Sequence, residues 1–111
     1  MTSVGKQYEQ LAADYLCNCG YTILNLNYST RFGEVDIIAQ KDNCIIFVEV
    51  KYRANTKYGN PCEAVNYYKQ KKLIATAQLY MCGGEDRQCR FDIIEITGGT
   101  IRHLINAFSE V

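Results

Sequence analysis

Two apolar-rich runs separated by a short polar turn constrain the fold of this chain more than any other feature. Residues 34–40 and 44–53 are rich in Ile and Val, and Lys41-Asp42-Asn43 between them are typical turn residues. This pattern predicts an antiparallel β-hairpin in which Asp42 and Asn43 form a two-residue turn. Lys41 then lies opposite Cys44, and this register determines the partner of every other residue in the hairpin.

Side chains alternate between the two faces of a strand, so the hairpin sorts its residues into two sets. One set is entirely apolar and must be buried: Val35, Ile37, Ala39, Ile46, Val48 and Val50. The other set mixes charges with apolar side chains: Glu34, Asp36, Glu49 and Lys51 with Ile38, Ile45 and Phe47. The register places Asp36 opposite Glu49 and Glu34 opposite Lys51. We therefore expect the charges to lie in a cleft lined by apolar groups.

Two opposed carboxylates repel each other unless a positive charge lies between them. Magnesium or manganese (Mg²⁺ or Mn²⁺) suits Asp36 and Glu49, because these ions take carboxylate oxygens and keep waters that a phosphate can replace. Lys51 lies on the same face, where it can position or deprotonate an attacking water or offset charge on a scissile phosphate. The alternative is a cross-strand ion pair of Glu34 with Lys51 beside a protonated or solvated Asp36.

The remaining pattern predicts a helix over 5–19, a strand over 21–28, a second helix over 63–81, and strands over 90–96 and 101–105. Ser3 and Gly20 are expected to bound the first helix, and Gly83-Gly84 to end the second. Loops are expected at 31–33 and 54–61, and Thr97-Gly98-Gly99-Thr100 joins the last two strands. This order predicts a single α/β domain over 1–111, with a mixed central sheet flanked by helices.

The charge is zero overall but unevenly distributed along the chain. Residues 1–50 hold three basic and six acidic side chains, whereas 51–72 hold six basic side chains against the single acid Glu63. Zero net charge argues against a strongly basic nucleic-acid-binding protein. The basic block nevertheless follows directly on the acidic hairpin.

Targeting and cysteine signals are weak. No apolar run of about 18 residues indicates a membrane span, and the N-terminus shows no apolar core of a signal peptide. Six cysteines without a secretory signal, and without paired C-x-x-C spacing, favour reduced thiols over disulfides or a zinc site. We expect a soluble, cytoplasmic protein.

The segments Gly33-Glu34-Val35-Asp36-Ile37-Ile38 and Phe47-Val48-Glu49-Val50-Lys51 resemble the YraN family of small bacterial endonuclease-like proteins. That family belongs to the restriction-endonuclease-like (PD-(D/E)xK) superfamily and is similar to archaeal Holliday-junction resolvases. The likeness runs along nearly the whole chain and includes Gly5, Glu9, Ala12, Leu16, Gly20-Tyr21, Leu24, Asn27, Gly59, Glu63-Ala64-Val65, Lys69-Gln70, Leu73, Arg90-Phe91-Asp92 and Asn106-Ala107-Phe108. Two positions depart from the family's pattern: Tyr52 stands where a small polar residue is frequent, and Asn66 where an acid is frequent.

The resemblance implies a restriction-endonuclease-like αβββαβ core and catalytic roles for Asp36, Glu49 and Lys51. By analogy with the resolvases, it adds Glu9 as a further metal ligand, against the alternative of a solvated helix residue. Glu34 is a fourth candidate ligand, or a partner for Lys51 or Arg31.

Basic and aromatic residues after the hairpin are candidates for nucleic-acid binding. Arg53, Lys57, Lys69 and Lys72 are expected to contact phosphates, although Lys69, Lys71 and Lys72 are also compatible with a solvated helix face. Tyr67 and Tyr68 could stack on bases, but packing in the core or at its rim is favoured. His103 has no evident partner in the sequence and receives no role.

The leading functional prediction is a metal-dependent endonuclease acting on DNA phosphodiester bonds, with branched or damaged DNA as candidate substrates. The first alternative is a nucleic-acid-binding module of the same fold without efficient cleavage. The second is an interaction protein that dimerises through a sheet edge. A homodimer would also extend the short DNA footprint of so small a nuclease.

Overall fold

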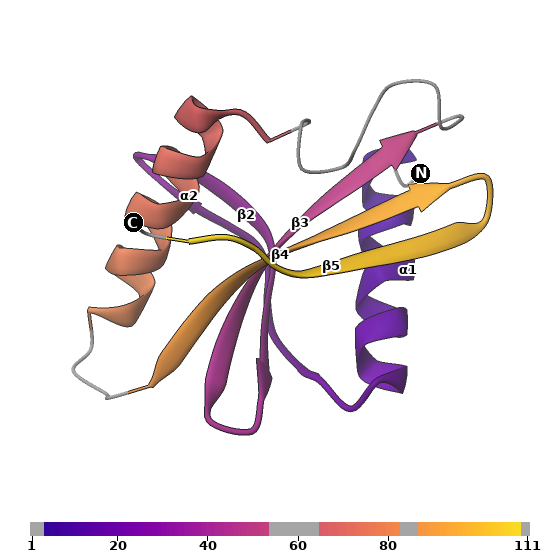
Figure 1. Cartoon of the computed structure of the whole chain (residues 1–111), viewed down its shortest axis with the longest axis horizontal. Coiled ribbons are helices and arrows are strands. Elements are labelled where there is room, and N and C mark those ends of the chain that lie inside the picture. Colours follow the sequence, from indigo (N-terminus) through magenta and orange to yellow (C-terminus); the bar gives the residue numbers. More distant parts are fainter. Residues whose placement is uncertain (1–3, 54–64, 83–86, 110–111) are drawn as a thin grey trace.

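A helix and three strands precede a second helix and two further strands, in the predicted order. The computed structural model describes residues 4–53, 65–82 and 87–109. Its elements are α1 (Val4–Asn18), β1 (Thr22–Thr30), β2 (Gly33–Lys41), β3 (Cys44–Arg53), α2 (Tyr67–Met81), β4 (Gln88–Thr97) and β5 (Thr100–Phe108) (Figure 1). The predicted cap at Ser3, the loop over 54–61 with Lys57, and the stop at Gly83-Gly84 lie outside the described residues.

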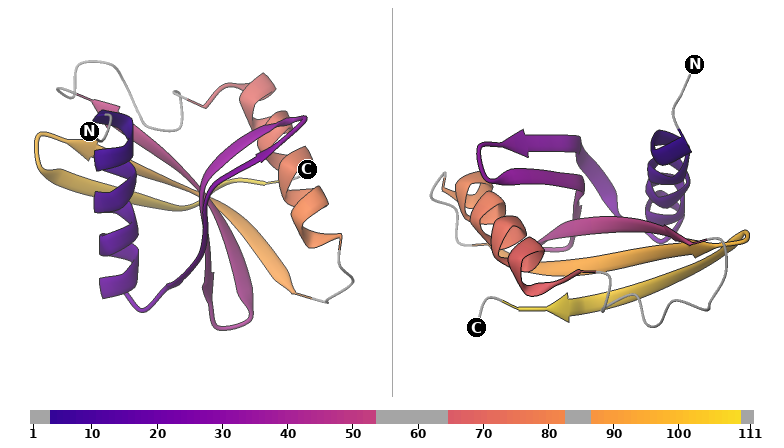
Figure 2. Two further views of the ribbon diagram at one scale, coloured as in Figure 1. Left: turned by 180° about the vertical axis from the view of Figure 1, so that it is seen from behind. Right: turned by 90° about the horizontal axis from the view of Figure 1, so that it is seen from above.

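The strands form one five-stranded sheet in the order β1-β2-β3-β4-β5. Strands β3 and β4 are parallel, and the other three neighbouring pairs are antiparallel, which confirms the predicted mixed sheet. The crossover from β3 to β4 contains α2, as a parallel connection requires. The two helices lie on opposite sides of the strands in Figures 1 and 2.

Both faces of the central strands are buried, each beneath one helix. Alternate residues of β3 divide between two clusters: Ile46 and Val48 pack with α1, whereas Ile45 and Phe47 pack with α2. The predicted apolar face is therefore confirmed around Val48. The charged face is not a cleft along its length, because α2 covers its apolar part, and any site is confined to the end of the strands.

The ends of the helices follow from specific backbone and side-chain hydrogen bonds. At the end of α1, Gly20 adopts a φ of +90°, and the Tyr21 amide donates to the Leu16 carbonyl at 2.9 Å in a Schellman arrangement. The prediction that α2 begins at residue 63 is wrong, because Val65 and Asn66 are not helical. Asn66 is extended instead and accepts the Lys69 amide through its side chain at 2.9 Å, so it is the N-cap.

The two tight hairpins depend on residues that tolerate a positive φ. Gly98 and Gly99 have φ values of +51° and +88°, as a type I′ turn between Thr97 and Thr100 requires. Asp42 adopts a φ of +54° in the turn of the central hairpin. Of the described helices, none is long and apolar enough to cross a membrane. The described cysteines, Cys17, Cys19, Cys44, Cys82 and Cys89, form no disulfide with one another.

Candidate functional site

Strand β2 loses its regular pairing at Asp36. The β2–β3 register runs from Lys41–Cys44 to Ile37–Val48, as predicted, and Asp36 and Glu49 lie directly beyond its last pair. On the other side, pairing with β1 passes from Ile37 to Val35 and skips Asp36, opposite Asn27 with a φ of +54°. The predicted opposition of Asp36 to Glu49 is thus not part of the ladder.

The irregularity also changes which core the start of β2 joins. Val35 packs in the cluster under α2, whereas Ile37, two residues later, packs in the cluster under α1. A regular strand would place both side chains on one face. The prediction that Val35 shares a face with Ile37 is therefore wrong, because the strand backbone reorients between the two residues.

Asp36 directs its carboxylate into the backbone of β3. Its Oδ2 accepts the Val50 amide at 2.8 Å, so a side chain takes the place of a carbonyl from the neighbouring strand. Burial and the negative charges of Glu49 and Glu9 together raise the pKa of Asp36 to about 7, while the Val50 hydrogen bond and Lys69 act in the opposite direction. Asp36 therefore lacks a cation sufficient to hold it ionised.

Glu49 is the buried partner of two lysines from different elements. Its side chain is 6% exposed, and its Oε1 lies 2.5 Å from Lys69 Nζ and 3.5 Å from Lys51 Nζ. Burial lowers the pKa of Lys51, and the neighbouring Lys69 ammonium lowers it further. For Lys69, burial also favours the neutral form, but the contact with Glu49 outweighs it and raises the pKa. Strand β3 and helix α2 thus meet at Glu49.

The two remaining candidate ligands lie in different surroundings. Glu9 comes from α1 and is near enough to raise the pKa of Asp36. Its Oε1 is buried and finds no hydrogen-bond partner among the described residues. Glu34 is exposed and accepts the Ser29 hydroxyl at 3.2 Å. Among the described ion pairs, Lys51 pairs with Glu49, so the alternative of a Glu34–Lys51 pair is wrong.

The candidate phosphate-binding residues are also dispersed. Lys69 is 39% exposed and turned toward Glu49. Arg53 is mostly buried, and its Nε lies 2.9 Å from Glu95 Oε2 on β4. Lys72 is exposed on α2, and its Cβ lies near Gly33, where an added Cβ would be 3.7 Å away. Lys57 lies outside the described residues.

The carboxylates fit a hard divalent cation with an incomplete protein shell. Within the described part of the chain, three or more His, Cys, Asp or Glu side chains nowhere gather into a ready-made metal cage. Magnesium commonly binds through one or two carboxylates and retains waters, so a complete cage is not required. The orphaned Glu9 oxygen and the weakly compensated Asp36 carboxyl are acceptors that such an ion would satisfy.

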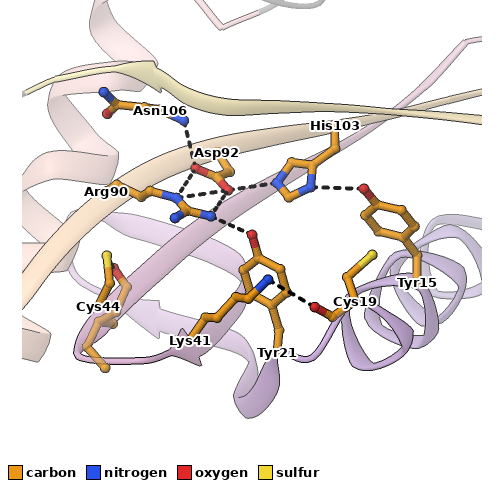
Figure 3. A network of polar contacts seen from close by, with 10 residues as sticks. Tyr15, Cys19, Tyr21, Lys41, Cys44, Arg90, Asp92, His103 and Asn106 are labelled. Carbon is orange, nitrogen blue, oxygen red and sulfur yellow. Dashed lines mark hydrogen bonds and ion pairs between the residues drawn. The ribbon is translucent and has the colours of Figure 1, made fainter.

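A second buried aspartate, to which the sequence assigned no role, lies beside Val48 on the face of the sheet that α1 covers (Figure 3). Asp92 Oδ2 lies 2.7 Å from His103 Nε2, and its Oδ1 accepts Arg90 Nε at 3.0 Å and the Asn106 amide at 2.9 Å. His103 Nδ1 lies 3.1 Å from the Tyr15 hydroxyl, which ties α1 to β5. The sequence signals were that Arg90 and Asp92 share one strand face and belong to the family likeness, and neither signal names a partner for His103.

The charge on Asp92 is stabilised by more hydrogen bonds than the charge on Asp36. Burial disfavours the charge on Asp92, but hydrogen bonds from His103, Arg90 and Asn106 outweigh it and lower its pKa. The negative charge of Asp92 is therefore compensated by groups of the protein itself, and no ligand is needed to stabilise it. The charges around Asp36 are not compensated to the same extent, because its pKa is raised.

Comparison with known proteins agrees with the likeness in the hairpin motifs. The family model described as "Uncharacterised protein family UPF0102" matches residues 8–96. A UPF0102 protein of Persephonella marina is 45% identical over 106 residues, covering 94% of this chain and 91% of the relative. A UPF0102 protein of Alkaliphilus oremlandii is 46% identical over 113 residues, covering 95% and 97%. The chain therefore belongs to the UPF0102 (YraN) family.

Proposed function

We propose that this protein is a metal-dependent endonuclease that hydrolyses DNA phosphodiester bonds. The observation that carries the proposal is that Glu49 and Glu9 act electrostatically on the buried Asp36, beside the end of the pairing between β2 and β3, so that three acids influence one another there. One of them has a buried oxygen without a hydrogen-bond partner in the described residues, and another has its pKa raised to about 7. Buried acids with perturbed pKa values beside lysines are typical of functional sites.

Asp36 and Glu49 would hold Mg²⁺ or Mn²⁺, with Glu9 as a further ligand. Such an ion would supply a positive charge for the phosphate and make water a better nucleophile. Glu34 accepts the Ser29 hydroxyl on the surface, so it supports this role least.

Lys51 is the residue that we assign to the attacking water. Burial and the neighbouring Lys69 lower its pKa, which increases the fraction of neutral amine able to accept a proton. Its contact with Glu49, at 3.5 Å, holds the ammonium or amine beside the carboxylates. Lys69, at the rim and 39% exposed, would offset the charge of the incoming phosphate.

A single assay tests the activity. Purified protein with Mg²⁺ or Mn²⁺ is incubated with single-stranded, duplex, flap and four-way DNA, and nicking is followed on denaturing gels. Asp36→Asn, Glu49→Gln and Lys51→Ala should each abolish cleavage, whereas Asp14→Asn, an exposed change of the same charge on α1, should not. Lys51→Ala should leave most DNA binding intact. Cleavage that survives in Asp36→Asn would remove this site from consideration.

The binding module without efficient cleavage remains a second candidate, for a specific reason. Lys69 and Lys51 already neutralise Glu49, so one proposed ligand is engaged without any metal. Gel shifts in EDTA separate the candidates: a binding module retains DNA without nicking it when metal is restored. A protein that serves only in dimerisation would bind no DNA under either condition.

A further inference from the structure

Two adjacent tyrosines at the start of α2 are left in solvent. Tyr67 is 66% exposed and Tyr68 is 76% exposed, so the favoured prediction that they pack in the core or at its rim is wrong. Their ring centroids lie 6.2 Å apart at an interplanar angle of 66°. Exposed aromatic side chains in neighbouring positions offer ring faces that bind other flat apolar groups.

Tyr67 opens a groove that runs along one stripe of α2. The groove has a volume of about 390 Å³ and is lined by Tyr67, Lys71, Ile74 and Gln78 from the helix, with Ser109 beyond β5. These helix positions are spaced at three and four residues, so they share one face. Figures 1 and 2 show the end of β5 alongside α2, and Ser109, which follows β5, lines the groove from outside the helix.

The groove combines an aromatic ring with positive charge. Lys71 Nζ lies 5.1 Å from the centroid of the Tyr67 ring, close enough for a cation–π contact. Lys72, on the next stripe, is also exposed, and the described residues of α2 include no acid. A surface that pairs ring faces with lysines matches the bases and phosphates of a single strand.

The same helix turn reaches the carboxylates. Lys69, two residues after Tyr67, contacts Glu49 at 2.5 Å. Side chains two residues apart on a helix point to different sides, so a strand that passes the carboxylates must turn around the start of α2 to reach the ring of Tyr67. In a regular duplex the bases are stacked on one another and offer no free ring face, so only an unpaired base can use Tyr67.

We propose that this groove binds an unpaired DNA strand that turns around the start of α2 after it leaves the carboxylates, with Tyr67 stacked on a base and Lys71 on a phosphate. The inference rests on the proposed nuclease site for its orientation, and it names the substrate class: DNA with a single-stranded segment, such as a flap or an open junction. Tyr68 supplies a second ring for the neighbouring base.

The test measures binding without cleavage, so that it does not depend on activity. A labelled oligothymidylate of about ten nucleotides, within the usual site size of such proteins, is titrated in EDTA by fluorescence anisotropy. Tyr67→Ala should weaken binding about 5- to 150-fold, the range that loss of one stacked base produces. Tyr67→Phe should bind like the native protein, because stacking needs the ring and not the hydroxyl. Lys71→Gln should lower the slope of log affinity against log salt by about 0.7.

Ile105→Ala is the matched control, since Ile105 is 58% exposed on β5 and does not line this groove. If Tyr67→Ala binds the oligonucleotide as tightly as Ile105→Ala and the native protein do, the inference is overturned. So would a native protein that cleaves duplex DNA but does not bind the oligonucleotide, or a Tyr67→Ala change that alters only self-association in sedimentation. Binding that depends on Tyr67 in a protein without nuclease activity would support the groove and refute the proposed function.

Discussion

At the scale of single residues, the sheet holds two buried aspartates with opposite electrostatic outcomes. Each is missing from the pairing with one neighbouring strand near an asparagine of positive φ, which is Asn27 of β1 for Asp36 and Asn106 of β5 for Asp92. Asp92 receives Arg90, His103 and a backbone amide, and its pKa falls. Asp36 receives one backbone amide, has carboxylates as neighbours, and its pKa rises to about 7. Both carboxylates are desolvated by burial, so the difference in pKa comes from their hydrogen-bond and charge partners.

Removing the charge of Asp36 should not harm the fold. In EDTA above pH 7, Asp36→Asn should leave the free energy of unfolding unchanged or up to about 3 kcal/mol higher, because one pKa unit corresponds to about 1.4 kcal/mol. The amide oxygen can still accept the Val50 amide. Urea denaturation measures the change, and Mn²⁺ should stabilise the native protein more than the variant. Strong destabilisation by the variant would show that Asp36 has a structural role.

Removing the charge of Asp92 should have the opposite effect. Asp92→Asn leaves Arg90 and His103 without their carboxylate, which should cost roughly 3 kcal/mol of unfolding free energy at neutral pH. The pKa of Asp92 is lowered, so its stabilisation is complete above the unfolded value of about 3.9 and is lost as pH falls through the folded value. Urea titrations from pH 7 to 3 should show the gap between native and variant closing below about pH 4. A gap that stays constant to pH 3 would contradict the assignment.

At the scale of elements, the candidate site exists because β2 and β3 pair regularly and then cease to pair. Their register from Lys41–Cys44 to Ile37–Val48 brings Asp36 and Glu49 to the same end of the hairpin. Beyond the last pair, α1 contributes Glu9 and α2 contributes Lys69. The regular pairing of β2 with β3 ends before Asp36, and there the Asp36 side chain accepts the hydrogen bond of the Val50 amide of β3. The N-cap at Asn66 then sets where α2 starts, and therefore which lysine reaches Glu49.

At the scale of the whole molecule, zero net charge conceals an uneven distribution. The described surface of α2 carries Lys69, Lys71 and Lys72, and the first of these contacts the buried Glu49 of the hairpin. A polyanion approaching those acids would be repelled without nearby cations. Binding to DNA should therefore be modest in strength and steeply dependent on salt.

Lys72 tests this surface without disturbing the carboxylates, because it is exposed. Lys72→Ala should weaken binding of duplex DNA in EDTA and reduce the slope of log affinity against log salt by about 0.9, the loss of one phosphate contact. Calorimetry should find its affinity for Mn²⁺ nearly unchanged. Lys6→Ala on α1 is a charge-matched comparison outside α2. If Lys72→Ala retains the native slope, DNA approaches by another surface.

The sequence by itself determined the order of the elements and the hairpin register, and it supplied the candidate site residues. These features follow from local rules: apolar alternation, turn residues at Asp42-Asn43 and Gly98-Gly99, and charged residues at fixed steps along a strand. The motif around Asp36 and Glu49 also indicated the family.

Only the tertiary structure decided which partner each charge receives. Lys69 forms an ion pair with Glu49, and His103 contacts Asp92. Glu34 accepts a hydrogen bond from Ser29 and is not the partner of Lys51. Periodicity within one element does not predict such contacts between elements. The exposure of Tyr67 and the change of core between Val35 and Ile37 likewise depend on how α2 and the strand break are placed. The physical reason is that pairing and burial are properties of packed elements, whereas periodicity is a property of one element alone.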